Sequence, residues 1–68
     1  MDILISKADL PHTIRKTTYS SYEEKAFNGS LNIVLHTSQG SFSYDILEEV
    51  TTEEKKEINQ VLNRYVQR

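Results

Sequence analysis

The C-terminal third of the chain carries the pattern that most restricts its fold. Its apolar residues recur at i, i+3, i+4, i+7 and i+8 and form one stripe of a helix: Ile58, Val61, Leu62, Tyr65 and Val66. Burying such side chains contributes roughly 1.5–3 kcal/mol each, which does not offset an ordering cost of about 1.5 kcal/mol for every residue of the helix. The stripe therefore needs an apolar partner surface built from the residues that precede it.

A capping pair indicates where this helix begins. Thr51 and Glu54 have the spacing at which each side chain accepts a hydrogen bond from the other residue's backbone N–H. Acidic residues follow in the first turns and Arg64 stands near the end, which is the charge order typical of stable helices. We therefore predict a helix that begins directly after Thr51.

The partner surface is predicted in the hairpin that spans Leu31–Leu47. A two-residue turn at Gln39-Gly40 sets Leu35 opposite Tyr44 and gathers the apolar residues of both strands on one face. A three-residue loop would shift the pairing by one residue and mix the two faces. The shorter turn is therefore preferred.

The other face of this hairpin is polar, and in the preferred register His36 lies opposite Ser43 with Asp45 one diagonal step away. Serine, histidine and aspartate within reach of one another suggest nucleophilic catalysis. No helix N-terminus or Gly-rich turn beside Ser43 offers an oxyanion site, and a flat sheet face does not exclude water. We therefore predict a solvated face that helps frame a contact, with no catalytic residues and no enzyme activity.

The N-terminal half is predicted to add strands. Asp2–Ser6 and Thr13–Tyr19 have the apolar or β-branched composition of strands, and Pro11 favours an extended residue before it. Residues 20–27 have two interpretations. They are either a strand that turns at Asn28-Gly29 into the next strand, or a short helix that begins with a capping box and ends at the same dipeptide. The strand is preferred.

Together these elements predict one α+β domain over residues 1–68, an antiparallel meander of three to four strands packed against one C-terminal amphipathic helix. The chain has no cysteine, and His12 and His36 lack the spacing of a metal-ligand pair, so no disulfide, metal or cofactor is expected. No apolar run is long enough to span a membrane. We expect a cytoplasmic location, and so small a core leaves room for a homodimer.

The charge pattern gives the first candidate site. The net charge is only −2, yet residues 45–57 hold six acidic and two basic side chains. We call the six carboxylates the acidic corner: Asp45, Glu48, Glu49, Glu53, Glu54 and Glu57. No large apolar residue lies between Val50 and Ile58, so this part of the helix is expected to project from the sheet. The acidic corner is predicted to dock on a basic surface of another protein.

A second candidate site lies in residues 12–22 and consists of Arg15, Lys16, Tyr19 and Tyr22. As a strand, this segment would set a cation beside an aromatic platform for stacking, which suits single-stranded nucleic acid. Two clustered cations neutralise few phosphates, so this binding is the alternative. The preferred hypothesis is a non-enzymatic protein-binding module, a modulator or inhibitor of a larger machine, including one that handles nucleic acid.

Overall fold

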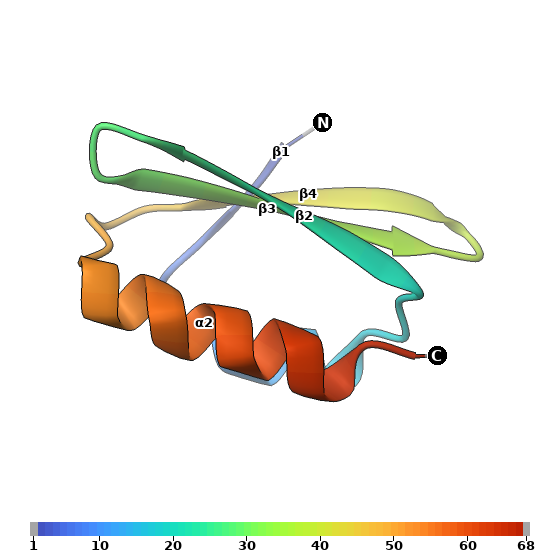
Figure 1. Cartoon of the computed structure of the whole chain (residues 1–68). Coiled ribbons are helices and arrows are strands. Elements are labelled where there is room, and N and C mark those ends of the chain that lie inside the picture. The colour runs from blue at the N-terminus through green and yellow to red at the C-terminus, as the bar shows by residue number, and fades with distance from the viewer. Residues whose placement is uncertain (1, 68) are drawn as a thin grey trace.

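The computed structural model describes residues 2–67 and places a four-stranded sheet over two helices that lie on the same face (Figure 1). The elements follow one another in the order β1 (Asp2–Ile5), α1 (Leu10–Lys16), β2 (Ser21–Phe27), β3 (Ser30–Thr37), β4 (Gly40–Ile46) and α2 (Thr52–Tyr65). The predicted α+β class is confirmed. The sheet has one face covered by helices and one face open to solvent.

Helix α2 is confirmed together with its cap. The Thr51 side chain accepts a hydrogen bond from the Glu54 backbone N–H at 3.1 Å, and the Glu54 carboxylate accepts one from the Thr51 N–H at 3.0 Å. Ile58 and Leu62 are buried against the sheet, while the other apolar residues of the stripe pack at the margin of the core. The sequence pattern therefore determined both the start of the helix and its buried side.

The sheet has the strand order β1-β4-β3-β2. Strands β2, β3 and β4 form the predicted antiparallel meander, but β1 pairs in parallel with β4 at the edge. A parallel neighbour cannot be reached by a tight turn, and here the connection from β1 to β4 runs through α1 and the β2–β3 hairpin. The prediction of a simple meander was therefore right for three strands only.

The predicted strand over Thr13–Tyr19 is wrong, because residues 10–16 form helix α1. Pro11 lies in the first turn of this helix, where its missing N–H is not needed and its fixed φ suits the helix. Leu10 and Ile14 are four residues apart and fully buried. Their burial in the core outweighs the strand preference of the β-branched residues around them.

Of the two predicted hairpin turns, one is confirmed and the other lies elsewhere. Asn28-Gly29 is a turn between β2 and β3, with φ of 47° and 85°, so the strand interpretation of residues 20–27 is confirmed. The second turn was misplaced: it lies at Ser38-Gln39, and Gly40 follows it with φ of 119°. A turn at Gln39-Gly40 that matched the twist of the strands would have required positive φ at Gln39, which the observed turn avoids. The shift is two residues, so each side chain keeps its predicted face but has a different partner across the strands.

The core lies between the sheet and both helices and consists of Leu10, Ile14, Tyr19, Leu31, Ile33, Leu35, Tyr44, Ile46, Ile58 and Leu62. Within this core, the Tyr19 hydroxyl donates a hydrogen bond to the carbonyl oxygen of Leu62 in α2 at 2.6 Å. Burial, followed by the neighbouring Tyr22, raises the pKa of Tyr19 to about 12. The Tyr19 carbonyl in turn accepts a hydrogen bond from the Gln67 N–H at 2.9 Å. Tyr19 thus holds both the last turns of α2 and the segment that follows.

We predict that Tyr19→Phe lowers the free energy of unfolding by roughly 1–3 kcal/mol, because the buried Leu62 carbonyl loses its donor. Thermal and urea denaturation followed by circular dichroism would measure the loss. Tyr22→Phe is the matched control, because it removes the same hydroxyl group from a neighbouring ring. The half-buried Tyr22 ring packs edge-to-face on Tyr19, with 6.2 Å between the two ring centroids. Equal stability losses in the two variants would contradict the role assigned to the Tyr19 hydroxyl.

Candidate functional site

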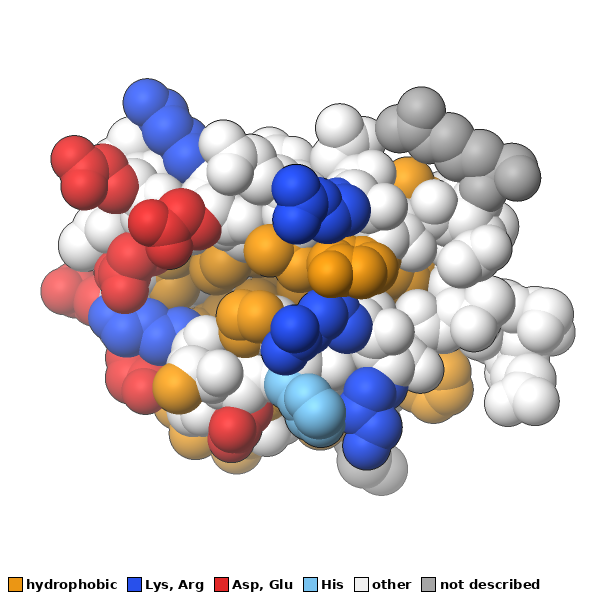
Figure 2. All heavy atoms as spheres, turned by 90° about the horizontal axis from the view of Figure 1, so that it is seen from below, with side chains coloured by type: hydrophobic (Ala, Val, Ile, Leu, Met, Phe, Trp, Pro, Cys, Tyr) orange, Lys and Arg blue, Asp and Glu red, His pale blue; other side chains and the backbone are white. Residues whose placement is uncertain are grey.

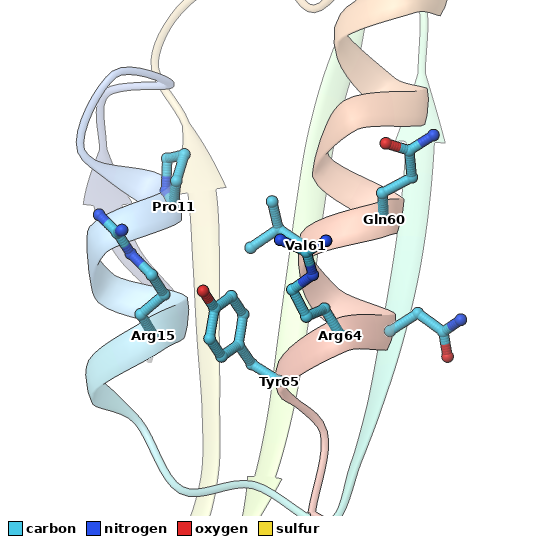
Figure 3. A pocket seen from close by; sticks show the side chains of 7 residues that line it. Pro11, Arg15, Gln60, Val61, Arg64 and Tyr65 are labelled. Atoms are coloured by element: carbon cyan, nitrogen blue, oxygen red, sulfur yellow. The ribbon is translucent and has the colours of Figure 1, made fainter.

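A hollow lies between α1 and α2. It has a volume of about 630 Å³ and is lined by Pro11, Arg15, Gln60, Val61, Asn63, Arg64 and Tyr65 (Figure 3). A smaller hollow of about 150 Å³ shares Pro11 and Val61 with it and is lined further by Lys7, Glu54, Glu57 and Ile58. Because the two hollows share a wall, we treat them as one feature and call it the helix groove.

The floor of the helix groove is apolar and its ends differ in charge. Pro11 and Val61 lie where the two hollows meet, and the Tyr65 ring lies between the helices with its hydroxyl toward Arg15 (Figure 3). All three floor residues are half-buried, so part of each side chain is open to a ligand. Figure 2 shows exposed hydrophobic side chains among charged ones on the helix-covered side of the molecule.

The two ends of the helix groove carry opposite charges because α1 and α2 run in the same direction and both have cations in their last turn. Pro11 lies beside the first half of α2 and Arg15 beside its last turns, so the helices run the same way along the groove. Arg15 and Lys16 occupy the last turn of α1, and Arg64 occupies the last turn of α2. We call this side the basic end. The opposite side, where α2 begins, is the acidic end, and acidic side chains gather there in Figure 2.

Lys7 neutralises part of the predicted acidic corner. Its ammonium group lies 2.9 Å from Glu54 Oε2 and donates to the Glu49 carbonyl at 3.1 Å, while its backbone N–H donates to Glu48 Oε1 at 2.9 Å. The hydrogen bond from the Thr51 backbone, followed by that from Lys7, holds the pKa of Glu54 below its usual value. Glu48 and Glu54 therefore join the turn after β1 to the start of α2.

Three of the predicted carboxylates have other surroundings. Asp45 lies on the open face of the sheet, away from the helices, and accepts a hydrogen bond from Asn32 Nδ2 at 2.6 Å. Glu53 and Glu57 are exposed one helical turn apart on α2, and no ion pair among residues 2–67 involves them. These two glutamates are the carboxylates on α2 whose charge is available to a partner at the acidic end, whereas the exposed Glu49 side chain lies beside Gly29 in the β2–β3 turn.

The predicted nucleic-acid residues are not arranged as expected. Arg15 and Lys16 are exposed on α1, but Tyr19 is fully buried and Tyr22 packs against it. The ring of Tyr19 is therefore not available for stacking on a base. The strand that was to align the cation with this ring is a helix, so the geometry behind that prediction is wrong.

The polar sheet face also has different partners from those predicted. His36 Nδ1 lies 2.7 Å from Ser41 Oγ and His36 Nε2 lies 2.8 Å from Glu23 Oε2, so the predicted set of Ser43, His36 and Asp45 is wrong. The contacts join β2, β3 and β4 across an open surface. Glu23 was missed, although the Asn28-Gly29 turn already placed it diagonally from His36.

Ser41, His36 and Glu23 have the chemical groups of a catalytic triad: a hydroxyl nucleophile, an imidazole base and an orienting carboxylate. The ring and the carboxylate have 37% and 55% of their side-chain surface exposed, so water reaches both. Nucleophilic catalysis needs hydrogen-bond donors aimed at the developing oxyanion in a site that excludes water. The surroundings of Ser41 on this open strand do not supply such a site, and cross-strand bonding is the role that the geometry supports.

Two further properties concern the described residues alone. Residues 2–67 contain no group of three or more histidine, aspartate or glutamate side chains placed to hold a metal ion. Neither of the helices in this range has the length and apolar character needed to cross a membrane. The helix groove was not predicted from the sequence, because residues 13–19 were expected to form a strand and not part of helix α1.

We predict that Glu54→Gln lowers the melting temperature near neutral pH and that the difference from wild type disappears in acid. The folded-state pKa of Glu54 lies below the unfolded value, so its stabilising effect is present above the unfolded pKa and is lost as pH falls through the folded pKa. Melting curves between about pH 6 and about pH 3 measure this change. Glu53→Gln is the control, because the exposed Glu53 takes part in none of the ion pairs of residues 2–67, so this variant should follow the wild-type profile. A difference that persists unchanged at the lowest pH would argue against the Lys7–Glu54 pair.

Known proteins give no guide to this site. Comparison with protein-family models, curated proteins and solved structures finds no match to the chain. Any function assigned to it therefore rests on its own side chains and surfaces.

Proposed function

We propose that this chain is a small, non-enzymatic protein-binding domain that holds a segment of a partner protein in the helix groove. The observation that carries the proposal is an apolar floor, formed by Pro11, Val61 and Tyr65, that lies between an acidic and a basic end. Apolar clefts with a few polar groups at their margins are the usual form of binding sites. The partner segment places an apolar side chain on this floor.

The charges at the two ends select the partner and its direction. Glu53 and Glu57 at the acidic end favour lysine or arginine on the partner, in agreement with the basic surface expected from the sequence. At the basic end, Arg15 and Arg64 flank the Tyr65 ring and favour a carboxylate. A segment with a basic residue, an apolar residue and an acidic residue in order therefore fits in one direction only.

Such a domain acts by occupying a surface of its partner. A partner with a basic surface, including one that normally holds nucleic acid, has the charge that the acidic end requires. In this proposal the chain is a modulator or inhibitor of a larger machine. The absence of cysteine suits a reducing cytoplasm as the place of action.

We predict that the protein selects a specific pattern from a library of random peptides displayed on phage. The wild type should enrich peptides in which a large apolar residue has lysine or arginine on one side and aspartate or glutamate on the other. Val61→Asp places a charge on the floor and should weaken binding of a selected synthetic peptide by about tenfold or more in calorimetry. Circular dichroism shows whether this variant remains folded.

A pair of matched variants tests the acidic end. Glu57→Lys and Asp45→Lys change the net charge equally, but Glu57 lines the groove and Asp45 lies on the opposite face of the sheet. Only Glu57→Lys should weaken binding of the selected peptide. The proposal fails if the peptides enriched by the wild type show the same pattern as those enriched by a folded Val61→Asp variant. It also fails if the two lysine variants weaken peptide binding equally. Tight binding of single-stranded oligo(dT) that depends on Arg15 and Lys16 but not on Val61 would favour the nucleic-acid alternative instead.

A further inference from the structure

The two outer edges of the sheet differ in how many charged side chains they carry. The outer strand β2 carries Glu23 and Lys25 on its open face, and Glu24 points inward toward the helices. Glu24 Oε1 is buried and has no hydrogen-bond partner among the described residues, and this burial raises the pKa of the Glu24 carboxyl. Charged side chains and an inward-pointing charge are devices that keep an edge strand from pairing with another chain.

The opposite edge, β1, is only four residues long, and its one charged side chain, Asp2, lies at its start, so the rest of the strand is apolar. Its sequence D-I-L-I contains no lysine or proline, and Ile3 and Leu4 are 41% and 67% exposed. Leu47, which follows β4, is 62% exposed and donates its N–H to the Ile5 carbonyl. Because backbone groups alternate in direction along a strand, the N–H and C=O of Leu4 point away from β4. An apolar strand with unpaired backbone groups is a template for another strand.

We propose that β1 is a homodimer edge, at which two copies of this chain pair their β1 strands in antiparallel orientation. The two four-stranded sheets then form one continuous sheet. Residues directly opposite each other in an antiparallel pair project to the same face, so a two-fold axis through the pair must pass beside Ile3 or Leu4. An axis beside Ile3 would set Asp2 opposite Leu4, whereas an axis beside Leu4 sets Leu4 opposite Leu4 and Ile3 opposite Ile5.

The register centred on Leu4 identifies the occupant as a second copy. In this register, apolar side chains of one copy lie opposite apolar side chains of the other in the centre of the contact. The two Asp2 carboxylates lie at opposite ends of the paired strands. The same two-fold axis leaves both pairs of helices on one side of the joined sheet, with the helix grooves uncovered. Since the β2 edge is protected, assembly ends at two copies. A four-residue strand buries little surface, so the dimer is concentration-dependent.

Sedimentation equilibrium over a concentration series tests this proposal. From about 10 μM to about 1 mM, the wild-type mass should rise from 7.9 kDa toward twice that value. Leu4→Lys should remain at the monomer mass with an unchanged melting temperature, because Leu4 is largely exposed in the monomer. Ser21→Lys introduces the same charge on the β2 edge and should dimerise like the wild type.

Hydrogen exchange on the wild type gives a second measurement that needs no variant. Exchange of the Leu4 amide should slow as the concentration rises, whereas the exposed outward amides of β2 should not change. A wild type that stays monomeric throughout, or a Leu4→Lys variant that dimerises as strongly as the wild type, would overturn the proposal. Val61→Asp should still dimerise, so failure here and failure of the groove as a binding site are separate results.

Discussion

The hydrogen bond from the Tyr19 hydroxyl to the Leu62 carbonyl is the contact on which the helix layer depends. Tyr19 belongs to the connection between α1 and β2, and Leu62 lies in the last turns of α2, so this one bond joins the end of one helix to the end of the other. The donor also satisfies a carbonyl that the helix itself leaves without a partner. Because Tyr19 follows α1 by three residues and Leu10 and Ile14 share the core with Leu62, α1 lies alongside α2, and the space between them is the helix groove.

Features with a strong local period were predictable from the sequence. Helix α2 combines a 3.6-residue stripe with a capping box, and the β3–β4 hairpin alternates apolar and polar residues, so burial alone determines which face each side chain occupies. Helix α1 has only seven residues and contains β-branched Thr13 and Ile14, so its local signal favours a strand. Its helical state depends on Leu10 and Ile14 reaching a core built by later elements, which no local pattern encodes.

The same distinction explains the partial success at the candidate site. The glutamates at the start of α2 were recognised, because their helix was, and so were the cations of residues 15 and 16. These glutamates and cations lie at opposite ends of one groove only because α1 packs against α2, which no local pattern predicts. On the open face, a turn displaced by two residues kept His36 on its predicted side but gave it Ser41 and Glu23 as neighbours. The two-residue repeat of a strand determines which face of the sheet a side chain occupies, whereas its neighbours across the strands depend on the exact register.

The shared direction of α1 and α2 has a consequence for how the groove acts at a distance. Both helices end at the basic end, where their exposed carbonyl groups carry partial negative charge, and both begin toward the acidic end, where exposed N–H groups carry partial positive charge. These backbone partial charges oppose the side-chain charges at each end. The long-range potential of the groove is therefore weaker than its formal charges suggest, and it steers distant molecules little. Discrimination then occurs at contact, where guanidinium and carboxylate groups meet their partners at hydrogen-bond distance and screening by salt has less effect.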